Sequence, residues 1–248
     1  MDYAYKDRAD YLGDPDFTDV PQELLTSKKY AEGIYQLIKE KKTPSKINVN
    51  IVEGEETTHF SIVDKWGNAV SNTYTLNTAY GSGIIPTGTG ILMNNEMDDF
   101  SAAPGIPNQF GLLGAEANKI SPGKRPLCSM SPTIVMKNNE LFFTTGSPGG
   151  SRIISAVLQS ILNIIDFEMN LEEATYAKRI HHQWQPDILE IELSIDDKIK
   201  SELEAMGYEI RIRRPLTCIQ TIMYKNKMYS GYGDFRRPDA FASGNIND

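Results

Sequence analysis

A threonine that follows a polar segment and opens a strand can act as a nucleophile if the chain is cut just before it. Thr57 has this setting, because residues 43–56 are polar and residues 58–63 alternate as in a half-buried strand. The cut would free an α-amine, whose pKa of about 7.7–8.0 suits it to accept the hydroxyl proton. Thr57 and Thr58 can equally be a simple pair of residues with high strand propensity.

A glycine-rich loop precedes a strongly apolar helical segment. Residues 146–151 read Gly-Ser-Pro-Gly-Gly-Ser, and Gly149 and Gly150 leave their backbone N–H groups unshielded by side chains. Such a loop can hold an anion or a developing oxyanion. A phosphate loop fits less well, because Pro148 lacks a donor and no lysine follows. A tight strand-to-helix turn remains the alternative.

An acidic cluster lies at residues 94–99, where Glu96, Asp98 and Asp99 follow two asparagines. Carboxylates that face a pocket would bind an ammonium group or a metal with oxygen ligands. The spacing lacks the pattern of a calcium loop, which makes metal the weaker choice. A solvated acidic turn is the remaining interpretation.

Other catalytic patterns are missing. His181 and His182 are adjacent rather than one helical turn apart, so they form no helical metal pair and are interpreted as surface or packing residues. Two cysteines, Cys128 and Cys218, can form neither a disulfide framework nor a four-cysteine zinc site. The net charge of −8 over 248 residues argues against nucleic-acid binding. No apolar run is long enough to span a membrane.

The periodicity predicts an α+β fold in which helices pack on a mostly antiparallel sheet. A helix is expected from Pro21 to the basic residues 39–42, and residues 81–126 are expected to form functional loops between short strands. The other expected helices cover residues 152–167, 171–178 and 195–206. The expected strands cover residues 58–63, 69–76, 133–136, 141–145, 210–212, 219–224 and 228–232, with hairpins at the first two pairs.

Six motifs in order resemble one family. They are the stretches at 57–61 (TTHFS), 73–77 (TYTLN), 94–100 (NNEMDDF), 124–132 (KRPLCSMSP), 146–152 (GSPGGSR) and 181–187 (HHQWQPD). This series closely resembles bacterial γ-glutamyltranspeptidase, an N-terminal nucleophile hydrolase, and the resemblance covers essentially the whole chain.

The resemblance implies a precursor that cuts itself between Glu56 and Thr57. Residues 1–56 would then be the tail of a large subunit, and residues 57–248 the small, catalytic subunit. The implied fold is a four-layer αββα sandwich, completed by large-subunit residues outside this chain. The resemblance also implies a periplasmic or secreted location and no metal or organic cofactor.

The resemblance further implies a role for each matching residue. Thr57 would be the nucleophile, with Thr75 hydrogen-bonded to its hydroxyl, and Gly149 and Gly150 would form the oxyanion hole. Phe110, in the lid loop at 104–115, stands where a tyrosine is frequent.

The implied donor pocket has two ends. Asn77, Glu96 and Asp99 would hold the donor's α-ammonium. Cys128 and Ser129 would hold its α-carboxylate, at positions where the family often has two serines. An arginine of the large subunit, outside this chain, would also pair with that carboxylate.

The implied reaction transfers the γ-glutamyl group of glutathione to an amino acid, a dipeptide or water through a γ-glutamyl-threonine ester. Two alternatives stay open. One is a related amidase of the cephalosporin acylase or poly-γ-glutamate depolymerase type. The other is a fragment that never matures and has no catalytic role.

Overall fold

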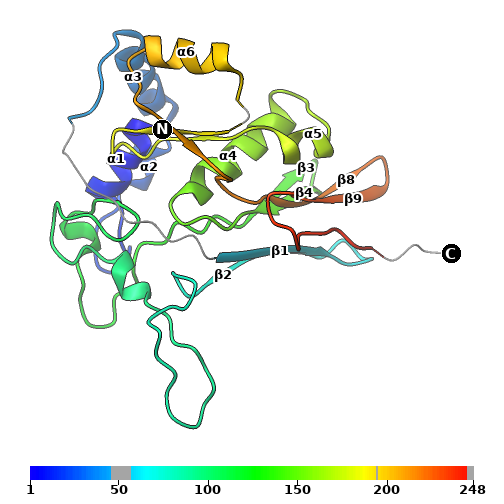
Figure 1. Cartoon of the computed structure of the whole chain (residues 1–248), viewed down its shortest axis with the longest axis horizontal. Helices are drawn as coiled ribbons and strands as arrows, with labels where there is room; N and C mark the ends of the chain where they lie inside the picture. Colours follow the sequence, from blue (N-terminus) through cyan, green and yellow to red (C-terminus); the bar gives the residue numbers. More distant parts are fainter. Residues whose placement is uncertain (46–56, 194, 245–248) are drawn as a thin grey trace.

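The computed structural model describes residues 1–45, 57–193 and 195–244. The N-terminal part is helical (Figure 1), with α1 at Asp2–Tyr11, α2 at Gln22–Leu25 and α3 at Lys28–Lys39. The single helix expected from Pro21 is divided in two because Ser27 caps α3, where its side chain accepts a hydrogen bond from the Tyr30 N–H at 3.1 Å. Helix α1 was not predicted. Only two of its residues, Tyr5 and Ala9, are buried, so its sequence shows little helical periodicity of apolar residues.

A four-stranded antiparallel sheet forms the centre of the fold, in the order β3-β4-β8-β9. Its strands are β3 (Thr133–Lys137), β4 (Glu140–Gly146), β8 (Gln220–Lys225) and β9 (Met228–Gly233). Helices α4 (Arg152–Ile165) and α5 (Leu171–Tyr176) pack on one face of it, around the fully buried Phe143 and around Ile164. These strands and helices confirm the predicted hairpin and apolar helix, and with them the α+β class.

The hairpin of β1 (Thr57–Val63) and β2 (Ala69–Thr75) stacks on the opposite face of this sheet (Figure 1). The inner face of the hairpin is largely polar. Ser61 Oγ donates to the Gln220 carbonyl at 3.0 Å, and Ser71 Oγ donates to the Thr145 carbonyl at 2.9 Å. Hydroxyl-to-backbone bonds therefore join the two sheets in place of apolar packing.

The outer face of the same hairpin is apolar and exposed. Phe60, Ile62, Val70 and Tyr74 point outward, and Tyr74 keeps 65% of its surface accessible. Contiguous apolar surface of this kind usually marks an interface. The described residues thus form three layers, helices, sheet and sheet, and leave the outer side of the third layer uncovered.

A smaller sheet lies beside α4. It consists of β5 (Ile180–His181), β6 (Leu189–Glu192) and β7 (Ile210–Arg213), with α6 (Asp197–Ala205) before β7. Strands β6 and β7 are parallel, and β6 is buried along its whole length. β5 and β6 were not predicted, because β6 alternates glutamates with apolar residues although both of its faces are covered.

The long segment between β2 and β3 is mostly loop, as expected. It contains two short 3₁₀ helices, η1 (Glu96–Asp99) and η2 (Glu116–Asn118), and no named strand, so the short strands expected there are not formed. Asp14 ties the N-terminal part to this segment. Its buried carboxylate accepts bonds from the Arg125 backbone N–H at 2.9 Å and from Arg125 Nε at 3.0 Å.

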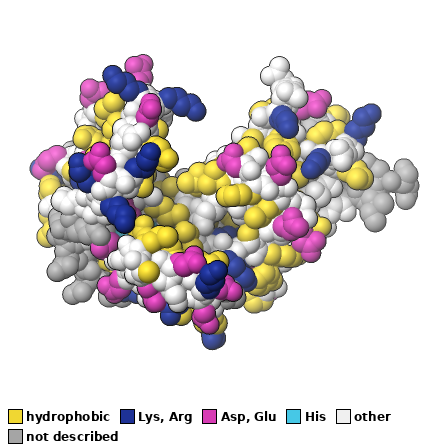
Figure 2. Space-filling model, turned by 90° about the horizontal axis from the view of Figure 1, so that it is seen from above, with side chains coloured by type: hydrophobic (Ala, Val, Ile, Leu, Met, Phe, Trp, Pro, Cys, Tyr) yellow, Lys and Arg dark blue, Asp and Glu magenta, His cyan; other side chains and the backbone are white. Residues whose placement is uncertain are grey.

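On the face drawn in Figure 2, Lys and Arg side chains are scattered among Asp and Glu, and hydrophobic side chains line part of a wide notch. The visible part of this face therefore carries no continuous basic surface of the kind that binds nucleic-acid backbones. Among the described residues, no helix is both long and apolar enough to cross a membrane.

Candidate active site

Thr57 and Thr75 face each other at the end of the β1–β2 hairpin. They are cross-strand partners, and the Thr57 hydroxyl donates to Thr75 Oγ1 at 3.3 Å. The Asn77 N–H donates to the same Thr75 oxygen at 2.8 Å, which fixes it toward Thr57. Thr57 itself is buried, so its hydroxyl is held in one place beside a second hydroxyl.

The nearest histidine in sequence does not offer Thr57 a base. Burial lowers the pKa of His59 to about 4, so its imidazole is neutral at pH 7. Its ring nitrogens lie 2.8 Å from Thr73 Oγ1 and 3.3 Å from Ser61 Oγ. Both ring nitrogens of His59 therefore face hydroxyl groups other than that of Thr57.

The Gly149–Gly150 turn requires glycine at both positions. Gly149 has φ 131° and Gly150 has φ 56°, in the region that favours glycine. A Cβ on Gly149 would lie 2.9 Å from Thr217 Cγ2, and a Cβ on Gly150 would lie 2.9 Å from the Phe110 ring. Within the described part of the chain, neither glycine N–H has a hydrogen-bond acceptor, so both remain available to an oxyanion.

One cavity collects nearly all of the predicted site residues. It is lined by Thr57, Thr75, Asn77, Glu96, Asp99, Phe110, Cys128, Ser129, Met130, Gly150, Ser151 and Ile153. Its volume of about 20 Å³ is room for roughly one water molecule, so a larger ligand enters only if a wall moves.

A larger cavity of about 580 Å³ lies on the other side of the turn, with Gly149, Thr58 and His59 in its lining. We assign the site to the smaller cavity, because it holds Thr57 and both acidic residues. Glu56, and with it the predicted cut, lies outside the described residues.

Two carboxyl groups, those of Glu96 and Asp99, line the smaller cavity. Burial, together with the nearby charge of Glu96, raises the pKa of Asp99 to about 7. Glu96 Oε1 is buried and has no hydrogen-bond partner among the described residues. Asn77 lies beside them with φ 76° and donates from Nδ2 to the Asn95 carbonyl at 3.2 Å. An ammonium group placed here would pair both acids and satisfy the unpartnered oxygen.

No group of three or more His, Cys, Asp or Glu side chains in the described ranges is arranged to hold a metal ion.

Cys128 and Ser129 form another wall. Cys128 is an exposed residue with a free thiol. Partial loss of hydration at its sulfur raises the pKa of the thiol, and Asp99 and Glu96 add to the shift, so the thiol stays protonated at neutral pH. Ser129 Oγ accepts a hydrogen bond of 3.0 Å from Arg8 Nη2 on α1. Sequence reasoning missed Arg8, because 121 residues separate it from Ser129 and no motif includes it.

Phe110 covers the glycine turn. It is buried against Tyr5 and Trp184, in the loop expected to act as a lid. Gln183 connects this loop to the turn, since its Nε2 donates to the Phe110 carbonyl at 2.8 Å and its Oε1 accepts from Ser151 Oγ at 2.6 Å. Gln183 lies in the motif at 181–187. Sequence reasoning did not identify its contacts to Phe110 and Ser151.

The histidine pair is buried rather than exposed, which decides between the two expected interpretations. His182 Nδ1 lies 2.6 Å from Asp2 Oδ1 on α1. His181 lies beside Ser155, and burial lowers its pKa to about 4. Both are packing residues that hold α1 and α4 against β5.

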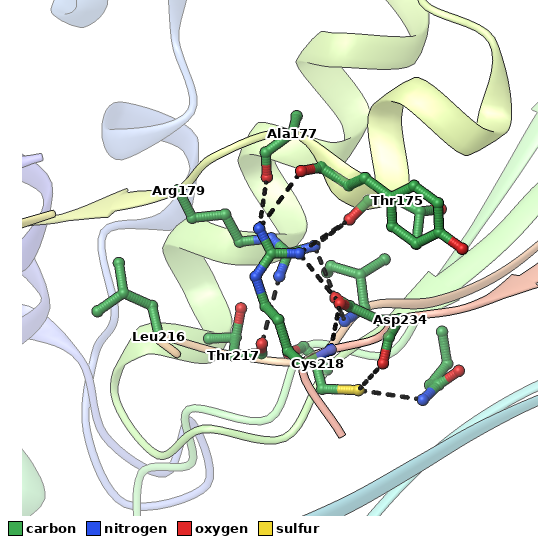
Figure 3. A network of polar contacts seen from close by, with 12 residues as sticks. Thr175, Ala177, Arg179, Leu216, Thr217, Cys218 and Asp234 are labelled. Carbon is green, nitrogen blue, oxygen red and sulfur yellow. Dashed lines mark hydrogen bonds and ion pairs between the residues drawn. The ribbon is translucent and has the colours of Figure 1, made fainter. Parts of the chain in front are cut away.

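A charged network lies around Arg179 and Asp234, next to Thr217 (Figure 3). Asp234 is fully buried and pairs with Arg179 at 2.9 Å and with Arg236 at 3.0 Å. Arg179 Nη1 also donates to the carbonyl of Thr217, the residue against which Gly149 packs, at 3.3 Å. Sequence reasoning did not predict this network, whose members come from separate parts of the chain.

Comparison with known proteins gives a consistent result. The family model described as gamma-glutamyltranspeptidase matches residues 1–244. The glutathione hydrolase proenzyme of Escherichia coli is 49% identical over 249 residues, which cover 98% of this chain and 43% of that protein. The chain thus spans less than half the length of this relative.

Solved structures also resemble the chain. The γ-glutamyltranspeptidase of Helicobacter pylori is 51% identical with a TM-score of 0.70, over 73% of this chain and 100% of that one. The enzyme of Pseudomonas nitroreducens in complex with L-DON is 45% identical with a TM-score of 0.72, over 77% of this chain and 100% of that one.

Proposed function

Because this chain belongs to the γ-glutamyltranspeptidase family, we propose that it supplies the catalytic part of an enzyme that transfers or hydrolyses the γ-glutamyl group of glutathione and similar amides. The observation that carries the proposal is the single cavity in which Thr57, Thr75, Gly150 and the Glu96–Asp99 pair meet.

The proposed precursor is cut between Glu56 and Thr57. The Thr57 hydroxyl attacks the Glu56 carbonyl, the acyl group moves from nitrogen to oxygen, and water hydrolyses the ester. Residues 1–56 then end a large subunit, and residues 57–248 form the small subunit. The new α-amine of Thr57 is the base that the histidines cannot provide.

In the proposed reaction, this amine takes the proton of the Thr57 hydroxyl as the oxygen attacks the γ-amide carbon of the donor. The N–H groups of Gly149 and Gly150 stabilise the oxyanion, and the amine returns the proton to the departing nitrogen. The γ-glutamyl ester on Thr57 is then opened by water, an amino acid or a dipeptide.

Donor binding follows the charges of the cavity. Asn77, Glu96 and Asp99 bind the α-ammonium, and Cys128 and Ser129 bind the α-carboxylate. Ser129 is the stronger donor of the two, because a thiol forms weak hydrogen bonds. Phe110 shields the reacting centre from water and moves to admit the donor.

The proposed partner is the remaining part of the same precursor. It would cover Phe60, Ile62, Val70 and Tyr74 and add the fourth layer of the sandwich. We further propose an exported enzyme, periplasmic or secreted, on the strength of the family alone.

A comparison of two donors tests the proposed substrate class. The mature full-length protein should turn over L-γ-glutamyl-p-nitroanilide with a kcat/KM at least about 10²-fold above that for glutaryl-p-nitroanilide, since the latter leaves the buried acids without a cation. An equal or higher kcat/KM for the glutaryl compound would instead support an acylase.

The raised pKa of Asp99 predicts how binding of the donor's α-ammonium group depends on pH. The carboxyl has to lose its proton before it pairs with an ammonium, so the inhibition constant of L-glutamate should rise about tenfold for each pH unit below 7. Above pH 7 it should be flat until the ammonium itself titrates. Asp99→Asn should weaken binding and remove this dependence. The matched variant Asp98→Asn, outside the cavity lining, should keep it, and a loss in both variants would contradict the assignment.

A further inference from the structure

Helix α1 reaches the donor cavity from the part of the chain that precedes Thr57. Arg8 Nη2 donates to Ser129 Oγ at 3.0 Å. One turn earlier, on the same helical face, the Tyr5 hydroxyl donates to the Ser151 carbonyl at 2.6 Å. Ser129 and Ser151 both line the cavity, so α1 is held over it at two points.

The lining of the cavity is electrostatically one-sided. Glu96 and Asp99 supply two carboxyl groups, and none of the described residues that line it is a lysine or an arginine. The guanidinium of Arg8 does not line the cavity itself but donates to the hydroxyl of Ser129, which does. The 3.0 Å contact between Arg8 Nη2 and Ser129 Oγ brings its charge close to a cavity that Asp99 and Cys128 also line.

The contact with Arg8 also sets the direction of the Ser129 hydroxyl. A hydroxyl has one proton and two acceptor lone pairs. Since Ser129 Oγ accepts from Arg8, its own proton is left to donate on the side of the cavity. A hydroxyl that accepts from a cation becomes a stronger donor, because hydrogen bonds in a chain polarise one another.

We propose that Arg8 is a specificity-determining positioning residue, which acts through Ser129 to direct one hydroxyl donor and one positive charge at the α-carboxylate of the donor. This inference rests on the proposed function. The family resemblance already implies one arginine, outside this chain, that pairs with this carboxylate. Arg8 would be a second positive charge, and it lies within residues 1–56.

Donors with and without the α-carboxylate test this role in the full-length precursor. Arg8→Met should lower kcat/KM for L-γ-glutamyl-p-nitroanilide about 10- to 100-fold, the loss expected for a charge-assisted hydrogen bond. For 4-aminobutyryl-p-nitroanilide, which keeps the amine and lacks the carboxylate, the loss should stay below about threefold. Lys6→Met removes a cation from the same helix, where Lys6 pairs with Asp10, and should change neither value.

A double-mutant cycle shows whether Arg8 acts through Ser129. In the Ser129→Ala background, Arg8→Met should cost clearly less in kcat/KM than it does in the wild type, because the contribution through the hydroxyl is already lost and only the direct attraction of the charge remains. Arg8→Gln serves the same comparison if the methionine variant does not fold. Equal losses for both anilides, or full additivity with Ser129→Ala, would overturn the inference. A wild-type enzyme that leaves the γ-glutamyl anilide intact would instead overturn the proposed function.

Discussion

Thr57→Ala should yield an uncut and inactive protein, whereas Thr58→Ala should be cut and should keep its activity within about tenfold of wild type. The two threonines are neighbours on β1, but Thr57 faces the cavity beside Thr75 and Thr58 points to the opposite, exposed face. The loss in kcat for Thr57→Ala should be about 10⁴-fold or more, as for other covalent nucleophiles.

Two measurements check this result. Intact-protein mass spectrometry should find a chain that begins at Thr57 in the wild type and in Thr58→Ala, and a continuous chain in Thr57→Ala. Release of p-nitroaniline from the γ-glutamyl anilide reports turnover. Normal turnover by Thr57→Ala, or by a wild-type protein that stays uncut, would exclude Thr57 as the nucleophile.

Gly150→Ala should reduce kcat by about 10²- to 10³-fold, the loss observed when an oxyanion donor is removed. The residue has a positive φ, and the added carbon would lie 2.9 Å from the Phe110 ring, so the turn has to shift its N–H groups. The inhibition constant of L-glutamate should change less than kcat, because Glu96 and Asp99, the proposed partners of its ammonium group, are unchanged.

Gly88→Ala is the matched control for backbone strain. Gly88 also has a positive φ, of 83°, but a Cβ there would have no neighbour within 4 Å. This variant should lose about 1 kcal/mol of stability in thermal unfolding and keep its kcat. If Gly150→Ala and Gly88→Ala have the same kcat, the glycine turn does not stabilise the transition state.

The sequence predicted the helices and strands whose apolar residues recur with a clear helical or strand period. It failed where buried positions are not apolar. The β1–β2 hairpin and α4 were predicted because alternating or helical apolar residues dominate them. Strand β6 was missed, because Glu190 and Glu192 look exposed in sequence but are buried against arginines of other elements. No local signal carries such long-range ion pairs.

The candidate site also contains residues that the sequence predicted and residues that only the structure relates to it. Motifs in order predicted candidate site residues from Thr57 to Gly150, but their spacing did not determine which of them share a cavity. Arg8 and Gln183 act through partners more than 70 residues away, so only the folded chain relates them to Ser129 and Phe110. The inward polar face of β1–β2 was also unexpected, because strand alternation usually turns its apolar side to the core.

The hydrogen-bonded ion pair of Asp14 and Arg125, called here the Asp14–Arg125 clamp, has a consequence for the proposed maturation. Hydrogen bonds to Arg125 hold the pKa of the Asp14 carboxyl well below its usual range, so the clamp stays charged at physiological pH. Together with Tyr5 on Ser151 and His182 on Asp2, it attaches the stretch before Thr57 to the stretch after it at three separate places. Scission at residue 57 would therefore divide the polypeptide without releasing either piece.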